Sequence, residues 1–247
     1  MDLSQAPKQR PEDRSDASNG ASVLRALPPR DTGALVRSVR EQLRLAIILE
    51  EIPPGTRLNQ VQLAAQLGVS RMPVRAASAE LVNEGLLVPI PSGGLAVRAL
   101  TRADVEAAYH VREALEVQAA RDVADRRPVE PLKRMFGILA DHEALGGAND
   151  TRALLELDRR FHMTMLDATE NPYFGLAMVP MWAVVERAMV GMLRTVPDMF
   201  NLAWQQHREI AEALQDGDGA LAQEKVHEHL QHACVQFTAN RALYPED

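Results

Sequence analysis

The sequence has little cysteine, few aromatic residues and no long apolar run. Its single cysteine, Cys234, cannot form an intrachain disulfide, which excludes a disulfide scaffold and fits a reducing cytoplasm. Aromatic residues make up only 4%, while alanine and leucine are abundant, which favours helices over a β-sandwich. The longest apolar stretch of the second half, about Leu176–Val185, is interrupted by Pro180 and is shorter than the roughly 18–20 residues of a membrane span. The first residues lack a signal-peptide pattern, so we expect a cytoplasmic protein that does not contact a membrane.

The length and the charge distribution indicate two unlike domains. The 247 residues exceed the roughly 100–200 of a usual single domain. The net charge of −7 argues against a nucleic-acid binder, but the charge is uneven along the chain. Residues 34–100 carry seven arginines and five glutamates, whereas residues 101–247 carry 15 basic and 24 acidic groups. A basic-leaning segment thus precedes a large acidic one, although a surplus of two charges also fits chance variation.

Residues 1–33 are predicted to be a disordered tail. They are rich in proline, serine, aspartate and arginine and have no apolar period, so they cannot bury enough surface to offset the entropy of ordering.

Residues 34–98 are predicted to form a winged helix-turn-helix. Apolar residues at spacings of three and four indicate a first helix from Ala34 to about Ile47 and a second after Asn59, which ends before Gly68. Ser70 is a suitable N-cap for a third helix, about Arg71–Asn83. Two short apolar pieces, 86–88 and 95–97, then indicate a β-hairpin.

The third of these helices carries two arginines on one face. Arg71 and Arg75 are four residues apart, so both project from the first turns of a helix that would lie in the major groove of double-stranded DNA. Arginines there can bind phosphate or pair with guanine. The alternative is that the two side chains only form a solvated helix face.

A longer motif surrounds these arginines. The chain has P-P-G-x-x-L at Pro53–Leu58, L-A-x-x-L-G-V-S-R-x-P-V-R at Leu63–Arg75, and L-x-x-E-G at 81–85. This string resembles the DNA-binding domain of GntR-family bacterial transcription regulators. The resemblance implies that Ser70, Arg71 and Arg75 contact operator DNA and that Arg44 contacts a phosphate.

Some positions depart from the usual family pattern. Asn59 stands where glutamate is common, Ala76 and Ser78 replace glutamate and leucine, and Gly93-Gly94 stands where the wing often has Arg-Gly. Without that arginine, the resemblance does not extend to a minor-groove contact by the wing tip.

Residues 101–241 are predicted to form an antiparallel bundle of about six helices, so that the whole chain is mostly α. Thr101 with Asp104 resembles a capping box that opens the first of them. Proline and glycine breaks divide the remainder. The expected helices are about Thr101–Arg126, Val129–Leu145, Thr151–Thr169, Tyr173–Thr195, Asp198–Gln215 and Ala220–Arg241.

Histidines in the bundle indicate a possible metal site. Asp158 and His162 are four residues apart, about 40° around a helix, so both can face one point. His207 and His229 lie on later helices. Imidazoles and one carboxylate in a bundle core are good ligands for zinc or another divalent metal, whereas the alternative is a set of ordinary surface polar residues.

The same residues carry a second resemblance. The order Asp-x3-His, then His-x-x-Ile-x-x-Ala at His207–Ala213, then His-Leu at His229 is similar to the FCD effector domain of FadR-type GntR regulators. That resemblance implies that Asp158, His162, His207 and His229 bind a divalent metal, zinc first and nickel or manganese as alternatives. His232 is a rival ligand, whereas we expect His227, His110 and His142 to be solvated or packed.

Arg112 is the candidate effector-binding residue. The segment Arg112–Glu116 is similar to the R-x-x-L-E of the first effector-domain helix of that family. A cation beside a metal suits an organic acid, since the metal takes one carboxylate oxygen and the guanidinium binds another. The alternative is an ordinary ion pair between Arg112 and Glu116 on one helix face.

These patterns together predict a homodimeric, ligand-responsive transcription regulator and not an enzyme. It would bind a palindromic operator in double-stranded DNA and respond to a small organic acid held at the metal site. The rival hypothesis is a metal-dependent enzyme that uses the same His and Asp side chains, although no H-E-x-x-H motif occurs. A third is a DNA-binding protein whose bundle only dimerises.

Overall fold

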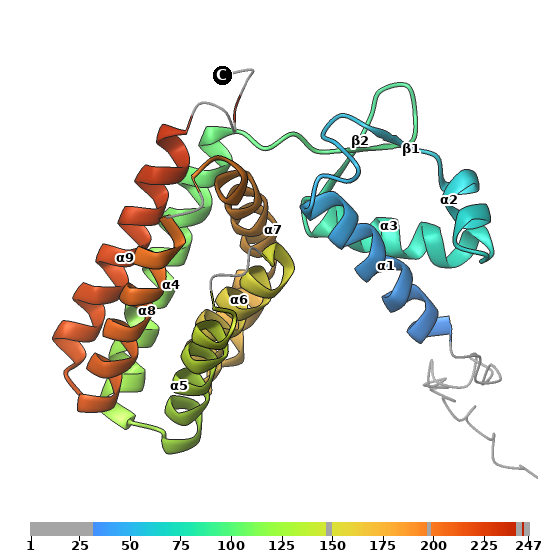
Figure 1. Ribbon diagram of the computed structural model, residues 1–247. Helices are drawn as coiled ribbons and strands as arrows, with labels where there is room; N and C mark the ends of the chain where they lie inside the picture. The colour runs from blue at the N-terminus through green and yellow to red at the C-terminus, as the bar shows by residue number, and fades with distance from the viewer. Residues whose placement is uncertain (1–31, 147–149, 197–198, 241–243, 245–247) are drawn as a thin grey trace, which may run out of the picture.

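The structure is a computed structural model that describes residues 32–146, 150–196, 199–240 and 244. The described chain forms a small N-terminal lobe with three helices and a sheet, followed by a larger helical bundle (Figure 1). This confirms the predicted mostly α fold class. The segment 1–31 of the expected tail lies outside the described residues, and Thr32 and Gly33 belong to the first helix rather than to a tail.

The N-terminal lobe has the predicted order of helices and wing. It consists of α1 (Thr32–Ile48), β1 (Arg57–Leu58), α2 (Gln60–Gln66), α3 (Arg71–Asn83), β2 (Leu87–Pro89) and β3 (Leu95–Val97). The expected hairpin of β2 and β3 is part of a three-stranded antiparallel sheet of order β1-β3-β2. Sequence periodicity missed β1 because a strand of two residues shows no alternation.

The local signals around α2 and α3 explain the tight turn between them. The Asn59 side chain caps α2 by accepting from two backbone amides, and Gly68 has the positive φ of +65° that a left-handed cap requires. Ser70 occupies the N-cap position of α3, but its side chain makes no capping hydrogen bond. The third residue of α3 is Pro73, which has no amide hydrogen to donate. The hydroxyl of Ser70 is therefore not used by its own helix.

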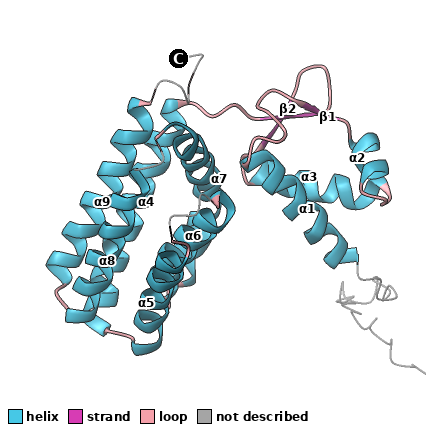
Figure 2. Ribbon diagram, in the orientation of Figure 1, coloured by secondary structure: helices cyan, strands magenta, loops and turns pink. Residues whose placement is uncertain are grey.

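The C-terminal part is a bundle built around α4. Thr101 and Asp104 form the expected capping box at its start. The helix α4 packs against α9, α7, α6 and α8, and Figure 2 shows that the described part of the bundle is almost entirely helical. In the described part of the chain the bundle consists of six helices. They are α4 (Arg102–Arg126), α5 (Val129–Ala144), α6 (Thr151–Asp167), α7 (Pro172–Thr195), α8 (Met199–Asp216) and α9 (Gly219–Ala239).

The bounds of these helices differ from the expected ones mainly at their ends. The helix α6 ends at Asp167 rather than at Thr169, whose hydroxyl donates to the backbone of α6, and α7 starts one residue early at Pro172. The expected start at Asp198 and the expected end at Arg241 lie outside the described residues. Helix ends fray and are fixed by individual caps, so periodicity alone places them within a few residues.

The helix α7 is more apolar than the sequence analysis allowed. It is the one helix among the described residues that is long and apolar enough to cross a membrane, because it continues through Pro180. However, 67% of its apolar 18-residue stretch is buried inside the bundle, and the helix carries the buried charged residues Glu186 and Arg187. Its apolar character is therefore that of a core helix.

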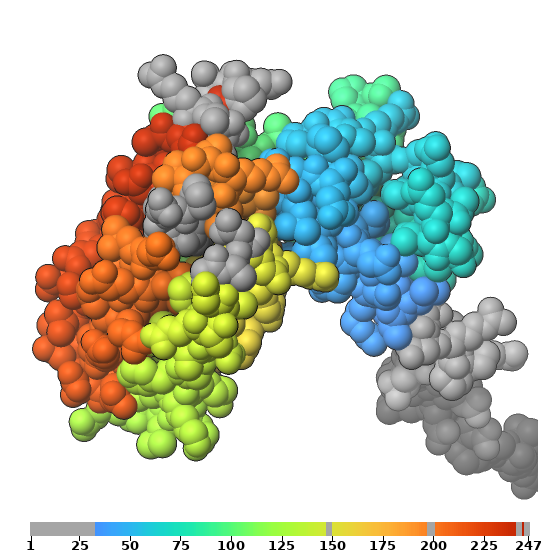
Figure 3. Space-filling view, viewed as in Figure 1, coloured from blue at the N-terminus to red at the C-terminus, as the bar shows by residue number. Residues whose placement is uncertain are grey.

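The two lobes touch through α1 and α7. The space-filling view shows the blue N-terminal lobe resting on the side of the bundle (Figure 3). Among the described residues, two ion pairs join the N-terminal lobe to α7, Arg44 with Glu186 and Arg194 with Glu50, and a third, Arg98 with Asp104, lies where the chain passes from β3 into α4.

Candidate metal centre and DNA-binding face

Four predicted metal ligands meet inside the bundle. Helix α6 contributes Asp158 and His162, α8 contributes His207 and α9 contributes His229, and all four are buried. The Nε2 atom of His207 lies 3.2 Å from the Nε2 atoms of both His162 and His229. An Asp158 oxygen lies 3.8 Å from Nε2 of His162 and 3.7 Å from Nε2 of His207.

The two separations between histidine nitrogens match the size of a tetrahedral metal site, and the Asp158 oxygen lies slightly farther out. Ligand atoms about 2.0–2.1 Å from a zinc ion sit about 3.3–3.4 Å from one another on a regular tetrahedron. The three histidines are also the one group of three or more candidate ligands with mutually close donor atoms in the described ranges, all within 4.8 Å. The chemistry and the spacing of the donor set therefore fit a bound divalent ion.

The outer nitrogens of the histidines indicate which atoms face the centre. Nδ1 of His162 donates to the Glu116 carboxylate at 2.6 Å, and Nδ1 of His229 donates to the Gln206 side-chain oxygen at 3.2 Å. Their Nε2 lone pairs therefore face inward, toward His207. Lone pairs that converge without a proton or cation between them are unfavourable, and such outer hydrogen bonds are typical of metal-bound histidines.

Burial and neighbouring charges set the protonation of this site. Burial lowers the pKa of His207 and His229 well below the usual value, and the other histidines lower it further. Burial raises the pKa of the Asp158 carboxyl. Burial also acts to raise the pKa of Glu116, but the nearby Arg112 and His162 outweigh it and lower that pKa to about 2. Neutral imidazoles, the form that the lowered pKa values of His207 and His229 favour, are the form that binds a metal.

Arg112 lies beside the cluster and makes the ion pair that its spacing allows. Its Nε donates to Glu116 at 2.7 Å, and its guanidinium lies 4.9 Å from the ring centre of Tyr109 and 5.2 Å from that of Trp182. One terminal nitrogen, Nη2, is buried and has no hydrogen-bond partner within the described residues. Arg112 thus retains a donor that a bound anion could use.

A small cavity joins Arg112 to the histidine cluster. Arg112, Asp158, Gln206 and His229 are among its lining residues. The space that the centre of a water molecule can reach is about 20 Å³, which is room for roughly one water. An organic acid would have to widen this cavity in order to enter.

The other histidines do not join the cluster. His232 lines the same cavity but stands outside the group of close donors. His227 pairs with Glu113 at the surface, and the His142 ring stacks on Trp204 at 4.1 Å. His110 is exposed beside a surface groove.

The face of α3 is free to meet DNA. Ser70, Arg71 and Arg75 are all exposed at its N-terminal end. Neither arginine makes a hydrogen bond or ion pair with any part of the chain that the structure describes. Arg44, the fourth predicted contact, is placed differently: its side chain is 12% exposed and is bonded to Glu84 and Glu186 between the lobes. In this arrangement it is not available to a phosphate.

Sequence reasoning missed three residues around these sites. Arg57 on β1 donates to the backbone oxygen of Gly93 at 2.7 Å, so an arginine reaches the wing tip from another strand. Glu116 was considered only as a partner of Arg112, although it also orients His162. Gln206 immediately precedes His207, but nothing in the sequence indicates that it meets His229.

The pKa shifts of His207 and His229 predict a pH-dependent stability. In metal-stripped protein, unfolding raises both pKa values toward about 6.5, so the unfolded chain binds more protons than the folded chain as the pH falls below that value. The free energy of unfolding should therefore be highest above pH 6.5 and fall toward pH 5, by up to about 1.4 kcal/mol per pH unit for each histidine.

Urea titrations at several pH values measure this slope. His229→Gln should reduce it, while His110→Gln, at an exposed position, should leave it unchanged. An identical slope in wild type and His229→Gln would contradict the assignment.

Comparison with known proteins agrees with both parts of the structure. Residues 35–97 match the family of bacterial regulatory proteins called gntR, and residues 98–232 match the FCD domain. The chain is 30% identical to an HTH-type transcriptional regulator of an unstable DNA locus in Streptomyces ambofaciens, over 85% of this chain and 88% of that protein. It is 27% identical to the transcriptional repressor RspR of Escherichia coli, over 76% and 82%.

Solved structures show the same fold. The chain resembles McbR/YncC of Escherichia coli with a TM-score of 0.72 and 19% identity, over 82% of this chain and 96% of that one. The Lar protein, which controls the agr system of Listeria monocytogenes, gives a TM-score of 0.60 with 20% identity, over 83% and 97%. Because the matching domains and relatives are regulators, the enzyme hypothesis is set aside. The chain belongs to the GntR family of bacterial transcription regulators and carries an FCD effector domain.

Proposed function

We propose that this regulator is a cytoplasmic homodimer that binds a palindromic operator and responds to a small organic acid bound next to a divalent metal. The observation that carries the proposal is the convergence of three buried imidazole nitrogens, with an Asp158 oxygen 3.8 Å from Nε2 of His162 and 3.7 Å from Nε2 of His207. A ligand changes DNA binding only if its affinity differs between two conformations of the protein, so the site must be coupled to the N-terminal lobe.

Asp158, His162, His207 and His229 are the residues that would hold the metal. Three imidazoles and one carboxylate suit zinc, and nickel and manganese also accept this donor set. When bound, the ion would supply a positive charge for an anionic effector. The four ligands come from α6, α8 and α9, so the ion would also join three helices of the bundle.

The effector class follows from the charge beside the metal site. Arg112 is buried and keeps one unpaired donor, and a planar guanidinium binds carboxylates in a fork. Because the adjacent cavity has room for roughly one water, the acid would enter by moving the wall that Gln206 and Tyr109 form. Such a movement is the kind of change that a ligand can transmit.

A symmetric dimer accounts for the predicted operator. Two copies related by a two-fold axis present two copies of α3, and they therefore read two half-sites in inverted orientation. The acidic surplus of residues 101–247 keeps the bundle away from phosphate, so that the winged lobe supplies the contacts.

The metal assignment predicts that His207→Ala loses stoichiometric metal. Three ligands bind less tightly than four, and the loss should also lower the melting temperature and abolish its dependence on zinc. Elemental mass spectrometry of protein purified without a histidine tag measures the content. His232→Ala is the matched control, because His232 lines the same cavity outside the cluster. If wild type carries no metal and chelators leave its melting temperature unchanged, the assignment fails.

The effector assignment predicts that Arg112→Lys abolishes the thermal shift caused by small mono- and dicarboxylates. Lysine keeps the charge but lacks the second donor of the fork. Arg121→Lys is the control, since Arg121 also pairs with a carboxylate four residues on but is solvent-exposed. The measurement is a melting curve of zinc-loaded protein with each acid. An equal shift in wild type and Arg112→Lys would remove Arg112 from the site.

The DNA assignment predicts that Arg75→Ala weakens specific binding by about 1–3 kcal/mol, the cost of one lost bidentate base contact. Gel shifts on an operator selected from random DNA by the wild-type protein measure this. The exposed bundle variant Arg134→Ala should bind that DNA as wild type does. Unchanged affinity of folded Arg75→Ala would show that α3 does not read the operator.

A further inference from the structure

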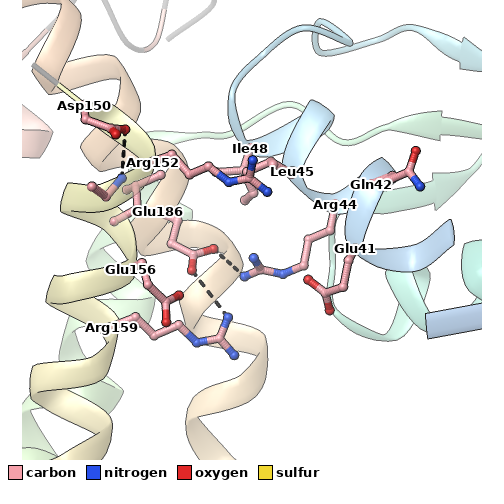
Figure 4. A pocket seen from close by; sticks show the side chains of 12 residues that line it. Glu41, Gln42, Arg44, Leu45, Ile48, Asp150, Arg152, Glu156, Arg159 and Glu186 are labelled. Atoms are coloured by element: carbon pink, nitrogen blue, oxygen red, sulfur yellow. Dashed lines mark hydrogen bonds and ion pairs between the residues drawn. The ribbon is translucent and has the colours of Figure 1, made fainter. Parts of the chain in front are cut away.

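A chain of charged side chains crosses the boundary between the two lobes. Arg44 on α1 reaches out of the N-terminal lobe and bonds to Glu186 on α7 (Figure 4). Within its own lobe, its Nε donates to Glu84 at 3.2 Å. The side chains of Glu84 and Glu186 are 9% and 5% exposed. Because water is largely excluded, these pairs are screened less than surface pairs and depend strongly on geometry.

This series of charged side chains begins next to the candidate metal centre. Arg159 directly follows the ligand Asp158 on α6, and its Nη1 lies 3.6 Å from Glu186. That contact is longer than a hydrogen bond. A shift of α6 by a few tenths of an ångström would therefore either bring Arg159 within hydrogen-bond distance of Glu186 or move it farther away. Two arginines, one from each lobe, thus approach this carboxylate, Arg44 at Oε2 and Arg159 at Oε1.

The series of charged side chains ends at α3, the helix proposed to read DNA. Glu84 is the C-cap residue of α3, and it accepts from Arg40 at 2.9 Å as well as from Arg44. Two arginines of α1 thus fix the position where α3 ends. The helix has 13 residues and is about 20 Å long, so a displacement at Glu84 moves the opposite end, where Arg71 lies.

The surroundings leave room for these side chains to move. A groove of about 530 Å³ runs between α1 and the bundle, and Arg44, Arg159 and Glu186 line it (Figure 4). Side chains next to such a space can change partners without displacing a packed core.

We propose that Glu186 and Arg44 are positioning residues for operator binding, and that they carry the state of the metal centre from Asp158 and Arg159 to Glu84 at the end of α3. The inference rests on the proposed metal site. When a metal binds, the Asp158 carboxylate moves toward the ion. The distance between Arg159 and Glu186 then changes, and this changes the ion pair between Glu186 and Arg44. Arg44 is then a link between lobes rather than a phosphate contact.

A second bridge between the lobes provides a matched control. Arg194 on α7 bonds to Glu50 and donates to the backbone oxygen of Leu49 at 2.7 Å. It is half exposed and makes no hydrogen bond or ion pair with α6 among the described residues. It holds the lobes together without a connection to the metal centre.

Amide hydrogen exchange on the full-length protein, with and without stoichiometric Zn²⁺, tests the proposal. In wild type, zinc should slow exchange in α6, α8 and α9 and also change it in α1 and α3. In Glu186→Gln, which keeps the shape of the side chain, the bundle should still respond and the α1 and α3 response should be lost. Arg194→Gln should respond as wild type does.

The outcomes separate this inference from the metal site itself. If zinc leaves α6, α8 and α9 unchanged in wild type, the metal site fails and the coupling fails with it. If zinc slows exchange in the bundle but α1 and α3 do not respond, the coupling alone is wrong. If α1 and α3 respond in Glu186→Gln as in wild type, or if Arg194→Gln loses the response, the route through Glu186 is wrong.

Discussion

The convergence of three imidazole nitrogens inside an apolar bundle is the constraint on which the C-terminal part depends. Their side chains come from α6, α8 and α9, so they meet only if these helices hold their relative rotation. Glu116 and Gln206 fix the ring orientations from outside, and Arg112 in turn holds Glu116. A buried polar cluster of this kind is stable only when each group finds a partner, and in the proposed function a divalent ion would supply the missing one.

In the proposed coupling, the same cluster is linked to the N-terminal lobe through the side chains next to it. Asp158 and Arg159 are neighbours on α6, so one faces the histidines while the other faces Glu186 at the lobe boundary. The recognition helix α3 ends at Glu84, on the far side of Arg44. In the proposed coupling, the acidic bundle influences α3 through a few partly buried charges.

Much of this architecture could be predicted from sequence because it is determined locally. The bounds of α3 were predicted correctly from Ser70, Pro73 and Gly85, and the capping box at Thr101 marked the start of α4. The cluster ligands were named from a family resemblance, which the spacing Asp158–His162 supports. Contacts between distant segments were not predictable: Arg44 has an ordinary place on α1, and only the packing of α1 against α7 brings it to Glu186. The strand β1, which carries Arg57 to the wing, was not predicted because its two residues show no alternation.

The central claim is that Asp158 and three histidines form one metal centre. X-ray absorption at the metal edge, on protein loaded with one equivalent of zinc, tests it most directly. The account predicts a single shell of nitrogen and oxygen atoms at about 2.0–2.1 Å with the outer-shell scattering of three imidazoles. A shell that contains sulfur, or fewer than two imidazoles, would place the ion elsewhere and contradict the account.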